Sequence, residues 1–470
     1  MALEHVTIAP MDPGRFRALL GERYAEVEAG IARAEDLFAG RVVWHVNSTA
    51  RGGGVVELLT SLLAYARGSG VDTRWVVIEG DADFFGVTKR IHNNLHGFAG
   101  DGGELGEPER RIYEGTLARN AAELASLMRP GDVAYLHDPQ TAGLIEPVKA
   151  AGATVVWRCH VGLDLPDELA RRAWDFLREY VSEADAYVFS RPEFAWEGLA
   201  EDKVWTVPPS IDAFSAKNQD LDPATVAAIL GVAGLGPPAT QAASFRRHDG
   251  SRARVDRAAE RFEDAAIDAA TPLVTQVSRW DRLKDPAGLI SCFHEHLGDS
   301  DADLLLAGPS VRSVADDPEG AEVLEEVREQ RSSLPDAVKR RIHLAALPMD
   351  DVEENAAIVN AIQRRSSVMV QKSIAEGFGL TVAEAMWKAR PVVASRRGGI
   401  QDQIGDGDTG ILVDDPHDLT AFGVAIRKLL DDRELAERMG VAARERVREH
   451  FLGTRSLLSY LALLGQLLEA

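Results

Sequence analysis

The sequence predicts an α/β protein made of two doubly wound halves, and three observations lead to this prediction. Short apolar runs alternate with longer amphipathic stretches, a pattern typical of parallel βαβ units. The alternation stops beyond Pro208-Pro209 and restarts near residue 273. The chain has 470 residues, enough for about two or three domains. We therefore expect one βαβ half on each side of the interruption.

The first half, residues 1–212, is expected to form an N-terminal domain with a mostly parallel sheet. Residues 55–67, after the first strand, are predicted to be a helix, and helical patterns separate most of the later strands. The expected strands are 41–46, 74–78, 132–136, 154–157, 186–189 and 204–207.

The second half, residues 213–449, is expected to form a domain of the same kind. It begins with a stretch rich in Ala, Asp and Arg, 213–265, whose basic loop 246–254 is interpreted as a solvated insertion. Residues 419–470 are predicted to form two or three helices, and 450–470 a helix that packs back on the first domain. The expected strands are 273–277, 302–307, 341–344, 367–370, 390–394 and 410–413.

The composition excludes several classes of protein. The formal charge is −22, from 52 Lys and Arg against 74 Asp and Glu, so we expect neither nucleic acid nor membrane as a partner. Two distant cysteines, Cys159 and Cys292, exclude a disulfide framework and a zinc spacing. No signal-peptide pattern opens the sequence, and the apolar tail segment 457–468 is too short to span a bilayer. We expect a reduced, cytoplasmic compartment.

Ligands of doubly wound sheets bind at the carboxyl ends of the strands, so the loops there are the candidate sites. The first, Asn47–Gly54, ends in Gly52, Gly53 and Gly54 before a helix, where backbone amides can approach an anion. It matches neither the dinucleotide fingerprint nor the Walker loop, and a tight turn is an equal alternative.

The second loop places Arg279 and Lys284 after a strand of the second half, as two cations suited to a diphosphate. Ion pairs to Asp281 or Asp285 are the alternative explanation.

The third loop, Glu376-Gly-Phe-Gly-Leu-Thr-Val-Ala-Glu384, is the most specific pattern in the sequence. Its glycines expose backbone amides at a helix that we expect to begin near Thr381. Glu384 has a structural alternative, a capping box with Thr381. Glu376 has few packing reasons to stand before a glycine loop and is the stronger candidate.

The fourth set of residues follows three consecutive strands of the first half: His137-Asp138, Arg158-Cys159-His160 and Ser190-Arg191. Polar side chains at three neighbouring strand ends indicate a pocket that recognises hydroxyl groups. For His137, a structural histidine satisfied by the fold is an equal alternative, and for His160 it is the weaker one.

Residues 375–386, with their Glu-x7-Glu spacing, together with 391–394 and Gly398-Gly399, resemble the retaining GT-B glycosyltransferases of family 4. The segments 44–49, 52–54, 157–160 and 277–279 are similar to those of the trehalose glycosyltransferring synthases within it, and fungal trehalose phosphorylases share similar segments. The resemblance covers residues 41 to 470.

The resemblance implies two Rossmann-like domains facing across a cleft, the N-terminal one for the acceptor and the C-terminal one for a nucleotide sugar. It implies transfer of glucose from ADP-, UDP- or GDP-glucose to free glucose, giving α,α-trehalose with retention. A retaining trehalose phosphorylase and a family 4 transferase with another sugar acceptor are the alternatives. Residues 213–265 do not align with the family, which leaves the donor base open.

The resemblance also implies roles for individual residues. In the donor site, Arg279 and Lys284 would hold the diphosphate, Glu384 the ribose hydroxyls, and the glycines 52–54 would close over the phosphates. His160 would contact the donor sugar near the reaction centre. The remaining donor contacts would come from Glu376, Gly377, Phe378, Gly379 and Leu380. The acceptor would be contacted by Asp138 and, more weakly, by Glu57, Arg191 and His137. The catalytic set would be His160, Arg279, Lys284 and Glu376.

No second carboxylate is evident on the far side of the sugar, which favours front-face transfer over double displacement. The scheme requires no cofactor or metal ion, and stimulation by Mg²⁺ is left open. The DxD-like pairs Asp81/Asp83 and Asp301/Asp303 are interpreted as solvated loop or strand-edge acids. Members of this branch often form dimers, so a homodimer is expected.

Overall fold

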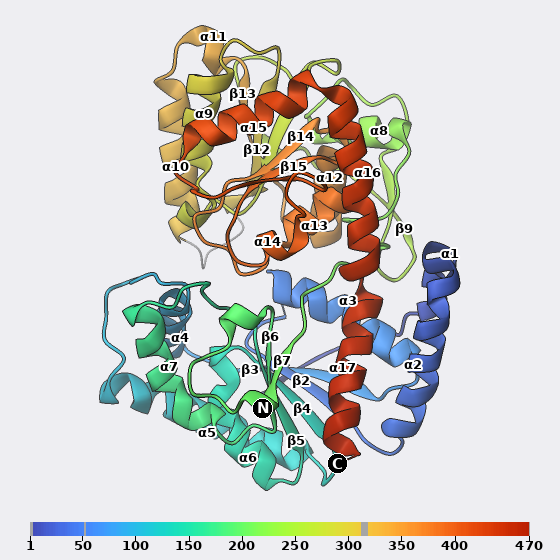
Figure 1. The fold of residues 1–470 in the computed structure, drawn as a ribbon, viewed down its shortest axis with the longest axis vertical. Helices are drawn as coiled ribbons and strands as arrows, with labels where there is room; N and C mark the ends of the chain where they lie inside the picture. The colour runs from blue at the N-terminus through green and yellow to red at the C-terminus, as the bar shows by residue number, and fades with distance from the viewer. Residues whose placement is uncertain (1–2, 51–52, 312–317, 470) are drawn as a thin grey trace. The chain divides into compact units, whose positions relative to one another are not determined.

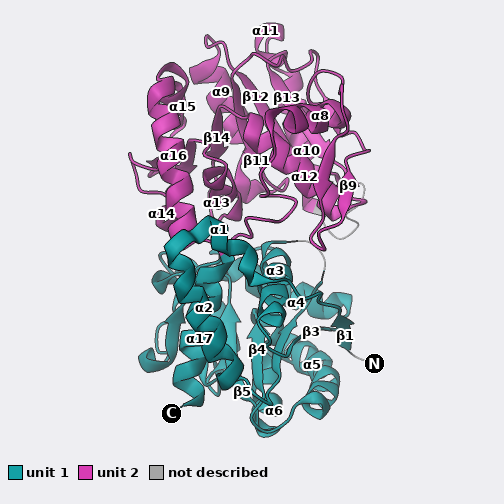
Figure 2. Ribbon diagram, turned by 90° about the vertical axis from the view of Figure 1, so that its right-hand side faces the viewer, with its two compact units in different colours: residues 1–210, 453–470 teal, residues 211–452 magenta. Residues whose placement is uncertain are grey.

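The computed structural model describes residues 3–50, 53–311 and 318–469. The chain divides into two compact units, which Figure 2 colours separately. Unit 1 comprises Met1–Ser210 and Gly453–Ala470, and unit 2 comprises Ile211–Leu452. Each unit is an α/β structure around its own sheet (Figure 1).

Unit 1 contains a seven-stranded sheet in the order β1-β3-β2-β4-β5-β6-β7. The neighbours are parallel except for β1, which pairs antiparallel with β3. The six parallel strands confirm the predicted ones, whereas β1 was not predicted because four half-exposed residues carry little hydrophobic pattern. The strands are β1 Leu3–Val6, β2 Val43–Asn47, β3 Thr73–Ile78, β4 Val133–His137, β5 Thr154–Cys159, β6 Ala186–Phe189 and β7 Val204–Thr206.

Helices cover both faces of this sheet. One face packs against α4 Ala82–Leu95, α5 Glu107–Leu127, α6 Ile145–Ala150 and α7 Glu168–Val181. The other packs against α2 Tyr24–Leu37, α3 Gly54–Gly68 and α17 Gly453–Leu468. The predicted helix 55–67 is α3. The short elements are η1 Pro13–Phe16, α1 Arg17–Leu20, η2 Gly21–Arg23, η3 Pro139–Leu144, η4 Pro192–Phe194 and η5 Glu201–Lys203.

Unit 2 repeats this topology in the order β10-β13-β12-β11-β14-β15-β16. Here β10 pairs antiparallel with β13 and the other neighbours are parallel, so all six predicted strands are present. The strands are β10 Glu260–Phe262, β11 Leu273–Val277, β12 Asp303–Pro309, β13 Ile342–Leu347, β14 Val368–Gln371, β15 Val392–Ser395 and β16 Ile411–Val413.

The apolar core of unit 2 lies between this sheet and α9, α10, α15 and α16. Outside that core, α12 contacts β11, and α13 contacts β14 and β15. The helices are α8 Pro223–Ala233, η6 Arg282–Lys284, α9 Pro286–Leu297, α10 Pro318–Ser332, α11 Asp336–Lys339, α12 Val352–Arg365, α13 Leu380–Trp387, α14 Ile400–Gln403, α15 Leu419–Asp431 and α16 Arg433–His450.

The segment 213–265 contains secondary structure that the sequence did not predict. It forms α8, a two-stranded hairpin of β8 Ser244–Arg246 and β9 Arg252–Arg254, and the edge strand β10. Most residues of the hairpin are exposed, as expected of an insertion, but Arg247 pairs with Asp351 and Glu353 at the start of α12. The two carboxylates, which are distant from the hairpin in sequence, hold it against the start of α12 within unit 2.

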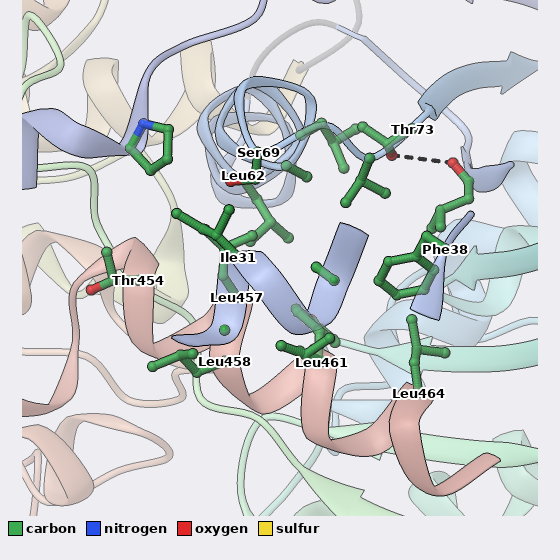
Figure 3. A pocket seen from close by; sticks show the side chains of 18 of the residues that line it. Ile31, Phe38, Leu62, Ser69, Thr73, Thr454, Leu457, Leu458, Leu461 and Leu464 are labelled. Atoms are coloured by element: carbon green, nitrogen blue, oxygen red, sulfur yellow. Dashed lines mark hydrogen bonds between the residues drawn. The ribbon is translucent and has the colours of Figure 1, made fainter. Parts of the chain in front are cut away.

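The helix α17 follows α15 and α16, so the C-terminal region has three helices where two or three were expected, and α17 belongs to unit 1. Its leucines line one side of a pocket of about 90 Å³, and α2 and α3 contribute the side chains opposite (Figure 3). The hydroxyl of Thr73, at the edge of this pocket, donates to the backbone oxygen of Val43 at 3.1 Å. Burial of this leucine face fixes α17 on the sheet.

Truncation of Leu463, which is fully buried in α17, is expected to destabilise unit 1. Leu463→Ala removes apolar contacts and leaves a cavity, which costs about 2–5 kcal/mol of unfolding free energy. Gln466→Ala, an exposed position in the same helix, should change it by less than about 0.5 kcal/mol. Calorimetric melting of both variants checks this, and equal melting midpoints would contradict the packing of α17.

Candidate active site

In unit 2 the chain reverses its direction of travel across the sheet at β11 and β14, which are neighbours in the sheet order. In doubly wound sheets such a switch point opens a crevice outside the carboxyl ends of the two strands. The loops that follow β11 and β14 are the second and third loops of the sequence analysis. The topology therefore brings these two candidate loops to one position.

Lys284 and Glu376 meet at this position. The Nζ atom of Lys284 lies 2.7 Å from Oε2 of Glu376, and the two side chains are only 15% and 11% exposed. The hydroxyl of Ser373 donates to the same carboxylate oxygen at 3.0 Å. The ammonium of Lys284 therefore pairs with Glu376, whereas the alternative explanation named Asp281 or Asp285. An ammonium has three N–H groups, so Lys284 can donate to a further anion while it holds Glu376.

A second ion pair fixes the loop that carries Lys284. Lys372, whose side chain has no exposed surface, pairs with Asp285. Asp285 also caps α9 by accepting a hydrogen bond from the backbone N–H of Gly288 at 2.9 Å. The side chain of Gln276 accepts from the backbone N–H of Lys372 at 3.0 Å and donates to the backbone oxygen of Lys284 at 2.9 Å.

Sequence reasoning missed Lys372. Its signal is a lysine directly after the apolar strand β14, at a position where the strand end is still buried. A buried ammonium needs a counter-charge, so such a lysine indicates an ion pair or an anion.

The glycine loop before α13 packs against a second glycine pair. The backbone N–H of Gly399 donates to the backbone oxygen of Gly377 at 2.9 Å. A Cβ at Gly398 would lie 1.8 Å from the backbone oxygen of Glu376, so only glycine allows this approach. Gly379, with φ of +81°, is the N-cap of α13, which begins at Leu380. Phe378 is 6% exposed.

Glu384 is buried inside α13, and the capping-box alternative for it is wrong. Its carboxylate lies 3.6 Å from Nζ of Lys217 and accepts from the side chain of Gln363 at 3.1 Å. The hydroxyl of Thr381 donates instead to the side chain of Gln371, at 3.1 Å. The ribose contact predicted for Glu384 stays a prediction.

Arg279 has the ion pair that the alternative explanation named. Its guanidinium lies 2.7 Å from the carboxylate of Asp281, which is largely buried. The Arg279 side chain is nevertheless 56% exposed, so its charge remains accessible to a ligand. A diphosphate role for Arg279 stays a prediction.

In unit 1 the strands β2 and β4 and the loop after β5 bring three histidines together. Nδ1 of His45 lies 3.1 Å from Nε2 of His137, and Nδ1 of His137 lies 3.2 Å from Nε2 of His160. His45 was not a candidate in the sequence, because a histidine inside a strand carries no site signal. Both ring nitrogens of His137 are engaged, so its predicted acceptor contact requires one of these bonds to open.

Asp138 follows His137 in sequence and has a φ of +64°, which few residues other than glycine adopt. Its carboxylate accepts the backbone N–H of His160 at 2.7 Å. Burial raises the pKa of Asp138 to about 6, although this hydrogen bond and the guanidinium of Arg158 both favour the charged form. A carboxylate held at a strand end in this way suits acceptance of sugar hydroxyls.

The other candidates of unit 1 lie on neighbouring loops. Arg191 is 5% exposed and pairs with Asp164 and with Glu193. Gly53 is the N-cap of α3, Gly54 begins the helix, and Glu57 is exposed in its first turn. Gly52 lies outside the described residues.

Residues 3–50, 53–311 and 318–469 contain no group of three or more His, Cys, Asp or Glu side chains that could hold a metal ion. Asp81 caps α4 by accepting the backbone N–H of Phe84 at 2.9 Å. In the same described ranges, no helix has the length and apolar character needed to cross a bilayer.

Comparisons with known proteins identify the family of the chain. Residues 45–196 match the family model of the trehalose synthase N-terminal domain, and residues 258–446 match that of glycosyl transferases group 1. The chain is 36% identical to a trehalose synthase of Thermococcus litoralis over 454 residues, 96% of either chain. It is 26% identical to a trehalose phosphorylase of Pleurotus pulmonarius, over 89% of this chain and 56% of that one.

A solved structure has the same fold. It is an α,α-trehalose-phosphate synthase (UDP-forming) from Burkholderia vietnamiensis, with a TM-score of 0.65 at 15% identity, covering 92% of this chain and 99% of that one. The two Rossmann-like units and these matches define the protein as a GT-B glycosyltransferase. The chain belongs to the trehalose synthase family of these enzymes.

The raised pKa of Asp138 predicts how its contribution to stability depends on pH. The folded protein binds this proton more tightly than the unfolded chain, whose carboxyl has a pKa of 3.8. The contribution of Asp138 to the unfolding free energy is therefore largest below about pH 4 and declines as pH rises to about 6. In Asp138→Asn, whose amide has nearly the shape of the carboxylate and does not titrate, this decline should be absent.

The measurement is the melting midpoint of Asp138→Asn minus that of the wild type, which should rise between pH 4 and pH 7. Asp101→Asn is the matched control, because Arg90 holds the pKa of Asp101 at about 2. Its melting midpoint relative to wild type should change in the opposite direction, falling as pH rises from about 2 to 4. A constant difference for Asp138→Asn would contradict its burial as a charged group.

Proposed function

We propose that the protein transfers the glucosyl group of a nucleoside diphosphate glucose to free glucose, forming α,α-trehalose with retention at the donor carbon. The contact between Lys284 and Glu376 carries this proposal. It places a cation and a carboxylate together where a doubly wound sheet binds its ligand. The ammonium suits a phosphate, and the carboxylate suits the hydroxyls of the sugar attached to it.

The leaving group sets the main chemical requirement. Breaking the bond between the anomeric carbon and the phosphate oxygen leaves positive charge on the sugar and negative charge on the diphosphate. Lys284 and Arg279 would stabilise that negative charge, and fixed cations lower the barrier because they need no reorganisation. The Lys372–Asp285 pair supports this, since it holds the Lys284 loop in place before the donor binds.

The donor sugar would be held by Glu376 and the backbone amides before α13. Oε2 of Glu376 already accepts from Lys284 and Ser373, whereas Oε1 accepts no hydrogen bond from the described residues. That oxygen is suited to a sugar hydroxyl. Glu384 would accept from the ribose hydroxyls.

The acceptor would be recognised in unit 1, where Asp138 would accept hydrogen bonds from glucose and His160 would contact the transferred sugar. The anomeric hydroxyl of the acceptor would attack the donor carbon from the face that the diphosphate leaves. The departing phosphate oxygen would take the proton of that hydroxyl, so that the products are trehalose and a nucleoside diphosphate. The scheme calls for no metal ion, because Arg279 and Lys284 would stabilise the negative charge that develops on the leaving group.

A product assay tests this proposal directly. The enzyme is incubated with glucose and UDP-, ADP- or GDP-glucose, and in parallel with trehalose and inorganic phosphate. Proton NMR should show α,α-trehalose with at least one of the nucleotide sugars and should not show glucose 1-phosphate from trehalose. Phosphate-dependent cleavage as the sole activity would establish a phosphorylase instead, and another disaccharide would show another acceptor.

The two cations are tested by substitution. Arg279→Ala and Lys284→Ala should each lower kcat by about 10²–10³-fold at saturating donor, the usual loss for a residue that stabilises transition-state charge. Arg282→Ala is the matched control, because Arg282 lies in the same loop but pairs with Glu326 on α10. Wild-type kcat in both test variants would contradict the assigned role.

A further inference from the structure

The three histidines of unit 1 form a diagonal line across three adjacent strands. His45 lies opposite Tyr135 in the register of β2 and β4, and His137 lies opposite Arg158 in the register of β4 and β5. Each step along the line from His45 to His160 therefore moves two residues toward the carboxyl edge of the sheet. Side chains two residues apart in a strand share a face, so the line runs on one face of the sheet.

The geometry within the line is regular. The ring centroids of His45 and His137 are 5.3 Å apart with an interplanar angle of 22°. Those of His137 and His160 are 5.4 Å apart at 16°. Tyr135 stacks on His45 at 4.8 Å and 9°, which fixes the inner end. The two hydrogen bonds thus join rings that the sheet already holds in place.

All three imidazoles are neutral at physiological pH. Burial lowers the pKa of His45 to about 3 and also lowers those of His137 and His160. The guanidinium of Arg158, whose side chain is fully buried beside them, lowers the last two further. A neutral imidazole has one N–H donor and one acceptor nitrogen.

Two hydrogen bonds among three neutral rings allow only two arrangements of the protons. In the first, Nδ1–H of His45 donates to His137, Nδ1–H of His137 donates to His160, and His160 presents Nδ1–H as an outward donor. In the second, every proton lies on Nε2, and His160 presents Nδ1 as an acceptor. The tautomer of His160 is therefore tied to that of His45.

The surroundings of His45 select the first arrangement. His45 lines the pocket between the sheet and α17, whose lining is mainly apolar. Its Nε2 has no hydrogen-bond partner among the described residues. In the second arrangement Nε2–H would be a donor for which the described residues provide no acceptor, and an unmet donor costs more than a bare acceptor nitrogen. In the first, both internal N–H groups are used.

We propose that His45 and His137 are positioning residues that hold His160 in its Nδ1–H form, so that His160 donates a hydrogen bond to an oxygen of the transferred sugar. The contact of His160 with the sugar rests on the proposed function. The tautomer coupling itself rests only on the chain of three rings.

The matched variants are His45→Asn and His45→Leu, which have nearly the same shape. The amide nitrogen of asparagine takes the place of Nδ1 and can still donate to His137, whereas leucine has no donor. His45→Leu should let His160 change toward the Nε2–H form and should lower kcat/KM by about tenfold, as loss of an outer hydrogen-bond partner often does. His45→Asn should retain the Nδ1–H form of His160 and most of the wild-type kcat/KM.

Nitrogen-15 NMR of histidine-labelled enzyme reads the tautomers without any substrate, and the His160→Gln spectrum identifies the His160 signals. The proposal expects Nδ1–H for His160 in the wild type and in His45→Asn, and a changed tautomer in His45→Leu. An Nε2–H form in the wild type, or the same tautomer in both variants, would overturn it. If the tautomers behave as expected but the product assay yields no trehalose, the coupling stands and the proposed function fails.

Discussion

The candidate donor site depends on one buried ion pair, between Lys372 at the end of β14 and Asp285 at the start of α9. Two buried charges are stable only together, since removal of either leaves the other unpaired in a medium of low polarity. The pair therefore fixes the loop after β11 against the end of β14. That constraint places Lys284 beside Glu376, and every step proposed for the donor follows from their contact.

The candidate site of unit 1 contains three uncharged histidines, in contrast to the ion pairs of unit 2. Under the proposed function its candidate residues would bind hydroxyls, which oriented hydrogen-bond donors and acceptors recognise. The sheet register aligns His45, His137 and His160, and burial keeps them uncharged. Asp138 beside them is held by the backbone of His160. Under the proposed function, the cations of unit 2 would stabilise the leaving group, and Asp138 and His160 of unit 1 would recognise sugar hydroxyls.

The sequence predicted both parallel sheets because strands buried on two faces are continuous apolar runs, and it predicted the site loops because polar residues interrupt those runs at strand ends. It missed the edge strands β1 and β10, which are short and pair antiparallel with segments distant in sequence. It missed Lys372 and His45 for a related reason. Their partners are set by strand register and by burial, and neither is visible before the chain is folded.

The measurement that tests the central claim is the binding of a nucleoside diphosphate and of the matching monophosphate, by calorimetry, to the wild type and to Lys284→Ala. If Lys284 contacts the distal phosphate, the wild type should prefer the diphosphate, and the variant should lose at least about tenfold of that preference, the effect of one charged hydrogen bond. Affinity for the monophosphate should not change. A variant that keeps the full preference for the diphosphate would contradict the account.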